Sequence, residues 1–226
     1  MKGDKDALSI VFNGDGSLGN ITVTAKSDGS VKGYVGNPQA SLPSKVGEKL
    51  RVGEVVGKGT LRIIYDGVVE IQSGEIADDI AYYLTSSDQI PSAVSLGVLF
   101  NDDSSVREAG GFIVQLMDGA TDETAALLEE RIASLPSVTT MLSEGETPES
   151  ILERILGDMD LQILEDGSVA FRCDCTRERT LKLLSLVSAD ELQDMVDEGE
   201  DVEMVCAFCN SKYQYSPDEI AALIEE

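Results

Sequence analysis

The spacing of apolar residues over the first third of the chain predicts β-structure. Apolar side chains recur at every second position in residues 8–12 and 21–25, which is the period of a half-buried strand. The turn sequence Ser27-Asp28-Gly29-Ser30 separates the second of these segments from a third strand, and Asn37-Pro38 ends the meander. The predicted strands are 8–12, 21–25, 31–35, 50–56 and 60–65.

A change of period after residue 73 predicts a helix and then a hairpin. Ile76, Ile80 and Tyr83 share one face of a helix that runs from Ser73-Gly74-Glu75 to about Ser86. Apolar runs at 95–100 and 111–117 flank the polar turn 101–105, which is typical of two antiparallel strands. A sheet with segregated helices indicates an α+β fold.

The segment 118–170 has a different character because it is acidic and contains no lysine. A helix is predicted over Asp122–Leu135, with Leu127, Leu128 and Ile132 on one face, and Pro136 ends it. Thr147 before Pro148 predicts the start of a second helix through Leu156. Short acidic helices bury little surface by themselves. We therefore interpret this segment as a linker of marginal stability that must dock on another part of the molecule.

The last quarter of the chain has clear boundaries between its elements. The turn Glu165–Ser168 leads into a strand at 169–173, and a helix is predicted from Thr176 to about Val187. Capping boxes at Ser188 and Ser216 predict two further helices, and short strands are predicted at 202–205 and around Tyr213 and Tyr215. This pattern places two pairs of cysteines on turns next to strands.

The segment Gly14-Asp15-Gly16-Ser17-Leu18-Gly19 matches the GxGxxG pattern of dinucleotide-binding proteins. That function needs a helix directly after the glycines, because the pyrophosphate binds at the helix N-terminus. The next residues, 20–24, are β-branched and alternating. We interpret the glycines as a hairpin connection.

Charge and composition exclude several classes of protein. The net charge is −25, of which −20 falls on residues 118–226, and such a field repels nucleic acid. No apolar run reaches the ~18–20 residues of a membrane span, and the first residues do not resemble a secretory signal. A cytoplasmic protein is the expectation. The absence of histidine excludes a His-based catalytic triad and a mixed Cys/His metal site.

The only four cysteines form a CxC pair and a CxxC pair. Cys173, Cys175, Cys206 and Cys209 have the number and softness to bind one zinc ion in a closed tetrahedral site. The same sulfurs could instead form two short-range disulfides. Spacing alone favours a structural zinc module. A thioredoxin-like enzyme is disfavoured because the βαβ context is missing.

The cysteine motifs resemble those of a known family. The motif Phe171–Arg179, with its Cys-Asp-Cys and Arg-Glu-Arg, followed by Cys206–Asn210 and Tyr213, is similar to the zinc module of the redox-regulated 33 kDa heat-shock chaperones. Upstream segments that resemble the family's N-terminal domain are Gly33–Pro38, Ser73–Ile76, Tyr82–Leu84, Pro91–Val94 and Ala109–Phe112.

This resemblance implies an ATP-independent holdase rather than an enzyme. In the reduced state the four cysteines would bind one zinc ion and the chaperone would be inactive. Oxidation would form the disulfides Cys173–Cys175 and Cys206–Cys209 and release the zinc. The linker and zinc domain would then unfold, and the protein, in the family a homodimer when active, would bind unfolding client proteins.

The family's organisation implies three parts. These are an N-terminal substrate-binding and dimerisation domain at 1–117, an acidic helical linker at 118–170 and a redox-sensing zinc-binding α+β module at 171–226. Family members have a further strand and helix before the residues that match Lys2-Gly3, and a longer segment at Tyr65–Val68, so the first domain is expected to be shortened. The alternative function is a zinc-stabilised adaptor without redox control.

Overall fold

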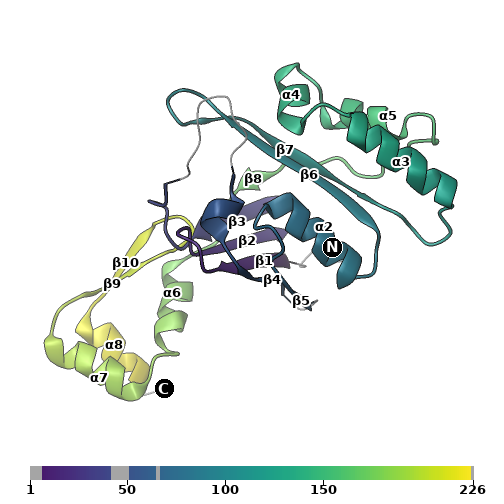
Figure 1. Cartoon of the computed structure of the whole chain (residues 1–226). Helices are drawn as coiled ribbons and strands as arrows, with labels where there is room; N and C mark the ends of the chain where they lie inside the picture. The colour runs from purple at the N-terminus through teal and green to yellow at the C-terminus, as the bar shows by residue number, and fades with distance from the viewer. Residues whose placement is uncertain (1–6, 42–50, 65–66, 225–226) are drawn as a thin grey trace. The chain divides into compact units, whose positions relative to one another are not determined.

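The computed structural model describes residues 7–41, 51–64 and 67–224 and confirms the α+β class (Figure 1). The chain forms two compact units. The larger unit contains Leu8–Val23 and Val35–Ser168, and the smaller contains Thr24–Tyr34 and the chain from Val169. Over the described ranges, no helix combines the length and the apolar character that crossing a bilayer requires.

The first strands confirm the predicted meander. The strand order is β5-β4-β1-β2-β3-β8, and the boundary between the units passes through β2 and β3. In the larger unit, β1 pairs antiparallel with β4, and β4 pairs antiparallel with β5, a strand that the sequence did not predict. The bounds are β1 Ala7–Gly14, β2 Asn20–Lys26, β3 Ser30–Val35, β4 Gly59–Ile63 and β5 Gly67–Glu70.

The predicted strand at 50–56 is wrong over its described part. Residues Gly53–Val56 form one helical turn, α1. Val55 and Val56 are both buried, whereas neighbouring residues in a strand point to opposite faces. Their carbonyls accept hydrogen bonds from the backbone N–H groups of Leu18 and Gly16, so the Gly14–Gly19 segment holds this turn. Gly14 and Gly16 are required by that close backbone approach, which confirms the hairpin interpretation of GxGxxG.

The predicted helix is present as α2 (Ile76–Ser86), and it packs on this sheet. Tyr83 is fully buried in a cluster with Phe12 and Leu61. The buried carboxylate of Asp79 accepts hydrogen bonds from the backbone N–H groups of residues 72, 73 and 74 at 2.8–3.1 Å. These bonds satisfy donors in the turn before the helix and fix where the helix begins.

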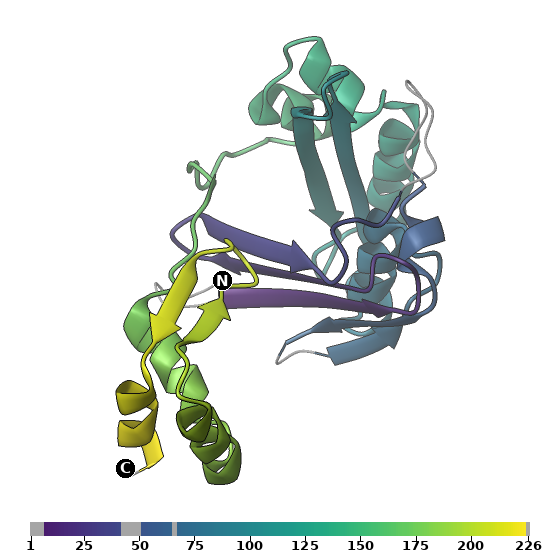
Figure 2. The same ribbon diagram turned by 90° about the vertical axis from the view of Figure 1, so that its left-hand side faces the viewer.

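The predicted hairpin is present as β6 (Ser92–Phe100) and β7 (Val106–Gln115). Helix α4 (Val138–Ser143) packs directly on one face of it (Figure 2). Glycine makes this approach possible, because a Cβ atom at Gly97 would lie 2.8 Å from Cγ2 of Thr139, and one at Gly110 would lie 2.8 Å from Cδ1 of Leu142. The sequence did not predict α4.

The acidic linker segment docks on the β6–β7 hairpin, as its small apolar content required. Helices α3 (Asp122–Ser134) and α5 (Pro148–Leu156) begin where predicted, α5 at its predicted cap Thr147 and α3 after Thr121, which the sequence did not identify as a cap. The buried residues of this region, which we call the linker core, pack with Phe112, Val114 and Leu116 at the end of the hairpin. The linker core consists of Leu128, Val138, Met141, Ile151 and Ile155.

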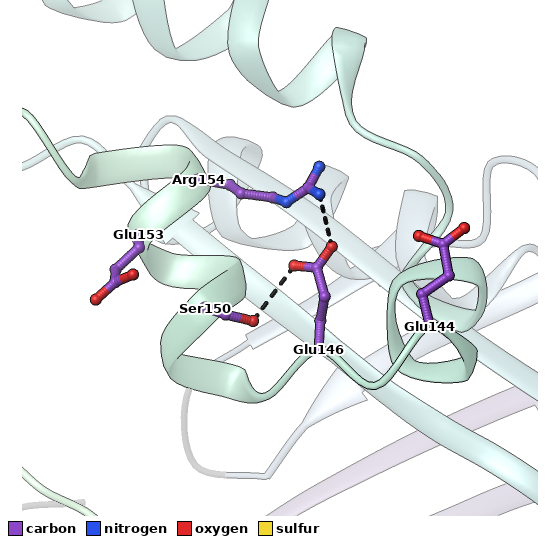
Figure 3. Close-up of a pocket in the computed structure, with 5 residues that line it drawn as sticks. All are labelled: Glu144, Glu146, Ser150, Glu153 and Arg154. Carbon is purple, nitrogen blue, oxygen red and sulfur yellow. Dashed lines mark hydrogen bonds and ion pairs between the residues drawn. The ribbon is translucent and has the colours of Figure 1, made fainter.

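A shallow hollow between α4 and α5 is acidic (Figure 3). Glu146 lies 2.9 Å from the guanidinium of Arg154 and accepts a 3.3 Å hydrogen bond from the hydroxyl of Ser150. These contacts tie the α4–α5 turn to the first two turns of α5. We interpret the hollow as a structural feature of the linker rather than a ligand site.

The smaller unit contains the C-terminal module (Figure 2). Leu184, Leu192, Tyr215 and Ile220 are its buried core, and the capping boxes at Ser188 and Ser216 are both present. The strand before Cys173 is shorter than predicted, and the following helix ends at Leu184 rather than Val187. The bounds are β8 Ala170–Phe171, α6 Arg177–Leu184, α7 Ala189–Glu198, β9 Val202–Val205, β10 Lys212–Tyr215 and α8 Pro217–Ile224.

Candidate metal centre

The fold brings all four cysteines together. Cys173 and Cys175 lie in the short segment between β8 and α6. Cys175 directly precedes Thr176, the N-cap of α6. Cys206 and Cys209 occupy the turn between β9 and β10. The N–H of Asn210 donates to the carbonyl of Cys206 at 2.8 Å, and the N–H of Cys206 donates to the carbonyl of Ser211 at 2.9 Å. This tight turn presents both of its sulfurs on the same side.

The four sulfurs have the separations that one tetrahedral ion requires. All lie within 4.8 Å of one another, with 3.6 Å between Cys173 and Cys206 and 3.4 Å between Cys175 and Cys209. Thiolates bound at about 2.3 Å around a tetrahedral ion lie roughly 3.8 Å apart. Within the part of the chain that the structure describes, this is the one cluster of three or more potential metal ligands that was found. The donor set and its geometry therefore fit a metal ion.

Neighbouring hydroxyl groups contact two of the sulfurs. The hydroxyl of Tyr213 donates to the backbone carbonyl of Cys175 at 3.1 Å and lies 3.1 Å from its sulfur. The hydroxyl of Ser211 lies 3.2 Å from the sulfur of Cys209. These contacts help to orient the side chains of Cys175 and Cys209.

Two of the thiols, those of Cys173 and Cys209, differ in acidity in the folded module when no metal is bound. Hydrogen bonding from Ser211 lowers the pKa of Cys209 to about 6. Burial raises the pKa of Cys173 to about 12. The thiolate is the reactive form of cysteine, so near neutral pH Cys209 is reactive whereas Cys173 is not.

This difference predicts an order of modification in the reduced protein immediately after a chelator removes the metal, before the C-terminal module unfolds. At pH 7, iodoacetamide should alkylate Cys209 before Cys173, because Cys209 is a thiolate above pH about 6 whereas Cys173 stays protonated. Ser211→Ala should raise the pKa of Cys209 and slow its alkylation at pH 7, with Ser185→Ala as the control. Peptide mass mapping over time measures this order, and equal rates for the two cysteines would contradict it.

The Arg-Glu-Arg sequence after the CxC pair has a structural role for each arginine. Arg177 forms an ion pair with Glu219 at 2.6 Å, donates to the carbonyl of Gln214 at 2.9 Å and stacks over the ring of Tyr215. The pair with Arg177 lowers the pKa of Glu219 to about 2. Arg179 donates to the carbonyl of Asp174 at 3.0 Å and pairs with its carboxylate. The arginines therefore fasten the CxC turn to the rest of the module.

Sequence reasoning missed a group of residues from the β2–β3 hairpin that lies beside the cysteines. Lys26 and Lys32 pair with Asp174 at 2.7 and 2.5 Å. The aromatic ring of Tyr34 meets that of Phe208 edge-on, with 5.1 Å between centroids. Both lysines are more than 140 residues away from Asp174 in the sequence. No local pattern indicates such contacts.

Comparison with known proteins agrees with this geometry. The family model described as "Hsp33 protein" matches residues 1–216. The chain belongs to the Hsp33 family. The 33 kDa chaperonin of Clostridium perfringens strain SM101 is 47% identical over 236 residues, which span all of this chain and 75% of the relative. The 33 kDa chaperonin of Clostridium beijerinckii is 46% identical, over 99% of this chain and 80% of the relative.

A solved structure supports the fold. The crystal structure of the 33 kDa chaperonin (heat shock protein 33 homolog) from Thermotoga maritima is 35% identical and superposes with a TM-score of 0.85. The match covers 98% of this chain and 78% of that one. The Hsp33 resemblance inferred from the cysteine motifs is therefore confirmed, and so is the α+β class with its four-cysteine cluster.

Proposed function

We propose that this Hsp33 family chaperone is a redox-regulated, ATP-independent holdase. In the reduced state, one zinc ion is bound by Cys173, Cys175, Cys206 and Cys209. On oxidation the zinc leaves, the C-terminal module and the linker unfold, and the protein holds unfolding clients. The observation that carries the proposal is the cluster of four sulfurs within 4.8 Å, in a family whose relatives are named chaperonins.

The small size of the module's core supports its dependence on zinc. Only four residues in the described part of this module are buried apolar side chains: Leu184, Leu192, Tyr215 and Ile220. Structural zinc contributes about 10–16 kcal/mol to the folding of small domains. A module with so few buried side chains is therefore expected to unfold when the ion is lost.

We propose the disulfides Cys173–Cys175 and Cys206–Cys209 for the oxidised state. In the reduced fold the sulfurs of Cys173 and Cys206 are 3.6 Å apart, so the cross-pairs are also within reach. Once the ion leaves and the module unfolds, only cysteines separated by one or two intervening residues stay close, because closing a long loop costs more entropy. Unfolding before the second disulfide forms therefore favours the local pairs.

In this proposal, the linker couples unfolding of the C-terminal module to exposure of apolar surface on the β6–β7 hairpin. Its helices cover one face of the β6–β7 hairpin and have few buried side chains of their own. The other face of the hairpin is apolar and exposed in the described structure, with Leu96, Val98, Phe100 and Ile113 each about half accessible. Release of the linker would add a second apolar surface to this one, and extensive apolar surface is what binds unfolded chains.

The remaining assignments follow from the family and the charge. We assign substrate binding and dimerisation to 1–117, the linker to 118–170 and redox sensing to 171–226. We propose a cytoplasmic protein without enzymatic activity that acts as a homodimer. The charge of −25 disfavours nucleic acid and anionic membrane surfaces as partners.

A paired assay tests the function. We expect the reduced protein to bind one zinc ion and to leave the aggregation of a heat-unfolded model enzyme unchanged. Hydrogen peroxide at an unfolding temperature should release the zinc to a colorimetric chelator and suppress the aggregation in the same samples. Dithiothreitol with zinc should reverse both effects.

Two results would contradict the proposal. Zinc release without any gain in aggregation suppression would leave the zinc-stabilised adaptor as the better interpretation. Suppression by the fully reduced, zinc-loaded protein would show that the cysteines are not the switch. Mass mapping of the oxidised protein identifies the disulfides, and a Cys173–Cys206 bond would overturn the proposed pairing.

A further inference from the structure

Asp174, the residue between the two cysteines of the CxC pair, is held by three cations. Its carboxylate pairs with Lys26 at the end of β2, with Lys32 in β3 and with Arg179 in α6. The hydrogen bonds from these three groups lower the pKa of Asp174 far below its ordinary range. Arg179 belongs to the C-terminal module, whereas the two lysines belong to the β2–β3 hairpin. Asp174 therefore connects the cysteine cluster with a distant part of the sequence.

The CxxC turn contacts the same hairpin. The ring of Phe208 lies edge-on against Tyr34, and the ammonium of Lys32 lies 4.6 Å from the centroid of the Phe208 ring. Lys32 thus contacts both cysteine motifs, one through Asp174 and the other through Phe208. Its side chain is only 15% exposed, so these interactions are stronger than those of surface ion pairs.

The backbone makes a third connection. β8 pairs in parallel with β3, with Ala170 opposite Ser30 and Phe171 opposite Val31. The N–H of Ala170 donates to Gly29 and the N–H of Arg172 donates to Val31, each at 3.0 Å. Arg172 directly precedes Cys173. A displacement of the cysteine cluster must therefore break the β3–β8 ladder, and stable pairing of that ladder restrains the cluster.

The metal-loaded cysteine cluster and the group of cations around Asp174 carry complementary charges. A divalent ion with four thiolates carries a net charge of −2. Lys26, Lys32 and Arg179 together with the carboxylate of Asp174 carry a net charge of +2. This arrangement places cations beside the sulfurs in a module that is otherwise acidic. Asp174 holds the three cations next to the CxC pair.

We propose that the β2–β3 hairpin, through Lys26, Lys32 and Tyr34, is an intramolecular docking surface for the metal-loaded cysteine cluster. Asp174 and Phe208 are the groups that it recognises. Docking slows metal release and so sets the oxidant dose at which the cluster opens. The regulatory meaning rests on the proposed function, whereas the docking itself does not.

The test compares three variants with the zinc-loaded, reduced wild type. Asp174→Asn removes the charge but keeps the shape of the side chain and the carbonyl that Arg179 contacts. Lys32→Gln changes the hairpin and leaves the module's own sequence intact, so it remains informative if the first variant folds poorly. Glu203→Gln is the matched control, since it also replaces a carboxylate in the module but breaks only the Glu203–Lys212 pair.

Two measurements report docking without any chaperone assay. At a fixed peroxide concentration, zinc release should be about five- to tenfold faster in Asp174→Asn and in Lys32→Gln, because each loses charged hydrogen bonds in a half-buried site. Amide hydrogen exchange at Ala170 and Arg172 should accelerate in both variants before oxidant is added. The double variant should accelerate zinc release by less than the product of the two single effects, since both substitutions remove the shared Lys32–Asp174 pair.

The outcomes separate this inference from the proposed function. Wild-type release and exchange rates in both single variants would overturn the docking surface, as would additive effects in the double variant or an equal acceleration in Glu203→Gln. If the variants accelerate zinc release while the oxidised wild type fails to suppress aggregation, the docking surface stands and the holdase proposal fails.

Discussion

Cys173→Ser is expected to lower the zinc affinity of the reduced protein by about 10²- to 10³-fold. Structural zinc sites are worth about 10–16 kcal/mol, so an equal share for each of four ligands is roughly 2.5–4 kcal/mol. A factor of ten corresponds to about 1.4 kcal/mol. A serine hydroxyl at this position is a much poorer zinc ligand than a thiolate, and the cluster has no fifth cysteine to replace it.

Competition with a chelator of known affinity measures this loss. The C-terminal module should also lose its folded far-ultraviolet circular dichroism at zinc concentrations that saturate the wild type. Leu186→Ser is the control, because it introduces serine at an exposed site of the same module. Unchanged affinity in Cys173→Ser would show that Cys173 is not a ligand.

Leu128→Ala should destabilise the docked linker by about 2–5 kcal/mol, which is the cost of truncating a buried leucine. Leu128 is 7% exposed in the linker core, whereas its neighbour Leu127 on the same helix is 38% exposed. Leu127→Ala makes the same chemical change with the same helix propensity, so the difference between the two variants isolates packing on the β6–β7 hairpin. We expect a far smaller effect for Leu127→Ala.

Urea unfolding of the zinc-loaded, reduced variants measures this difference. In the proposed mechanism, loosening the linker replaces the need for oxidation, so Leu128→Ala should suppress client aggregation under reducing conditions while zinc stays bound. Equal urea midpoints for the two variants would contradict the packing argument. If Leu128→Ala is destabilised but stays inactive when reduced, loosening the linker does not activate the chaperone.

The sequence predicted those parts of the fold whose signals are local. The caps at Thr147, Ser188 and Ser216 identified where three helices begin, because the capping side chain and its backbone partner are three residues apart. The four cysteines of the candidate metal centre were predicted to come together for a similar reason, since two short motifs contain them all.

The elements that sequence reasoning missed depend on distant partners. The α1 turn was predicted as a strand because its two valines have high β-propensity, yet its carbonyls are held by a loop that is nearly forty residues away. Helix α4 has only six residues, three of them β-branched, and it is stable because Gly97 and Gly110 leave room for it. The lysine contacts of Asp174 link residues 142 and 148 positions apart, for which no periodicity exists.

The two-residue strand β8 covers one edge of β3 in the folded protein. A strand at the edge of a sheet presents unpaired N–H and C=O groups, to which the strand of another molecule can add. β8 occupies that edge of β3 in the folded module. In the proposed mechanism, opening of the module frees this edge at the moment when misfolded chains are most abundant. Lys32 in the middle of β3, together with the charge of −20 on residues 118–226, then opposes intermolecular strand pairing by electrostatic repulsion and the cost of desolvating a charge.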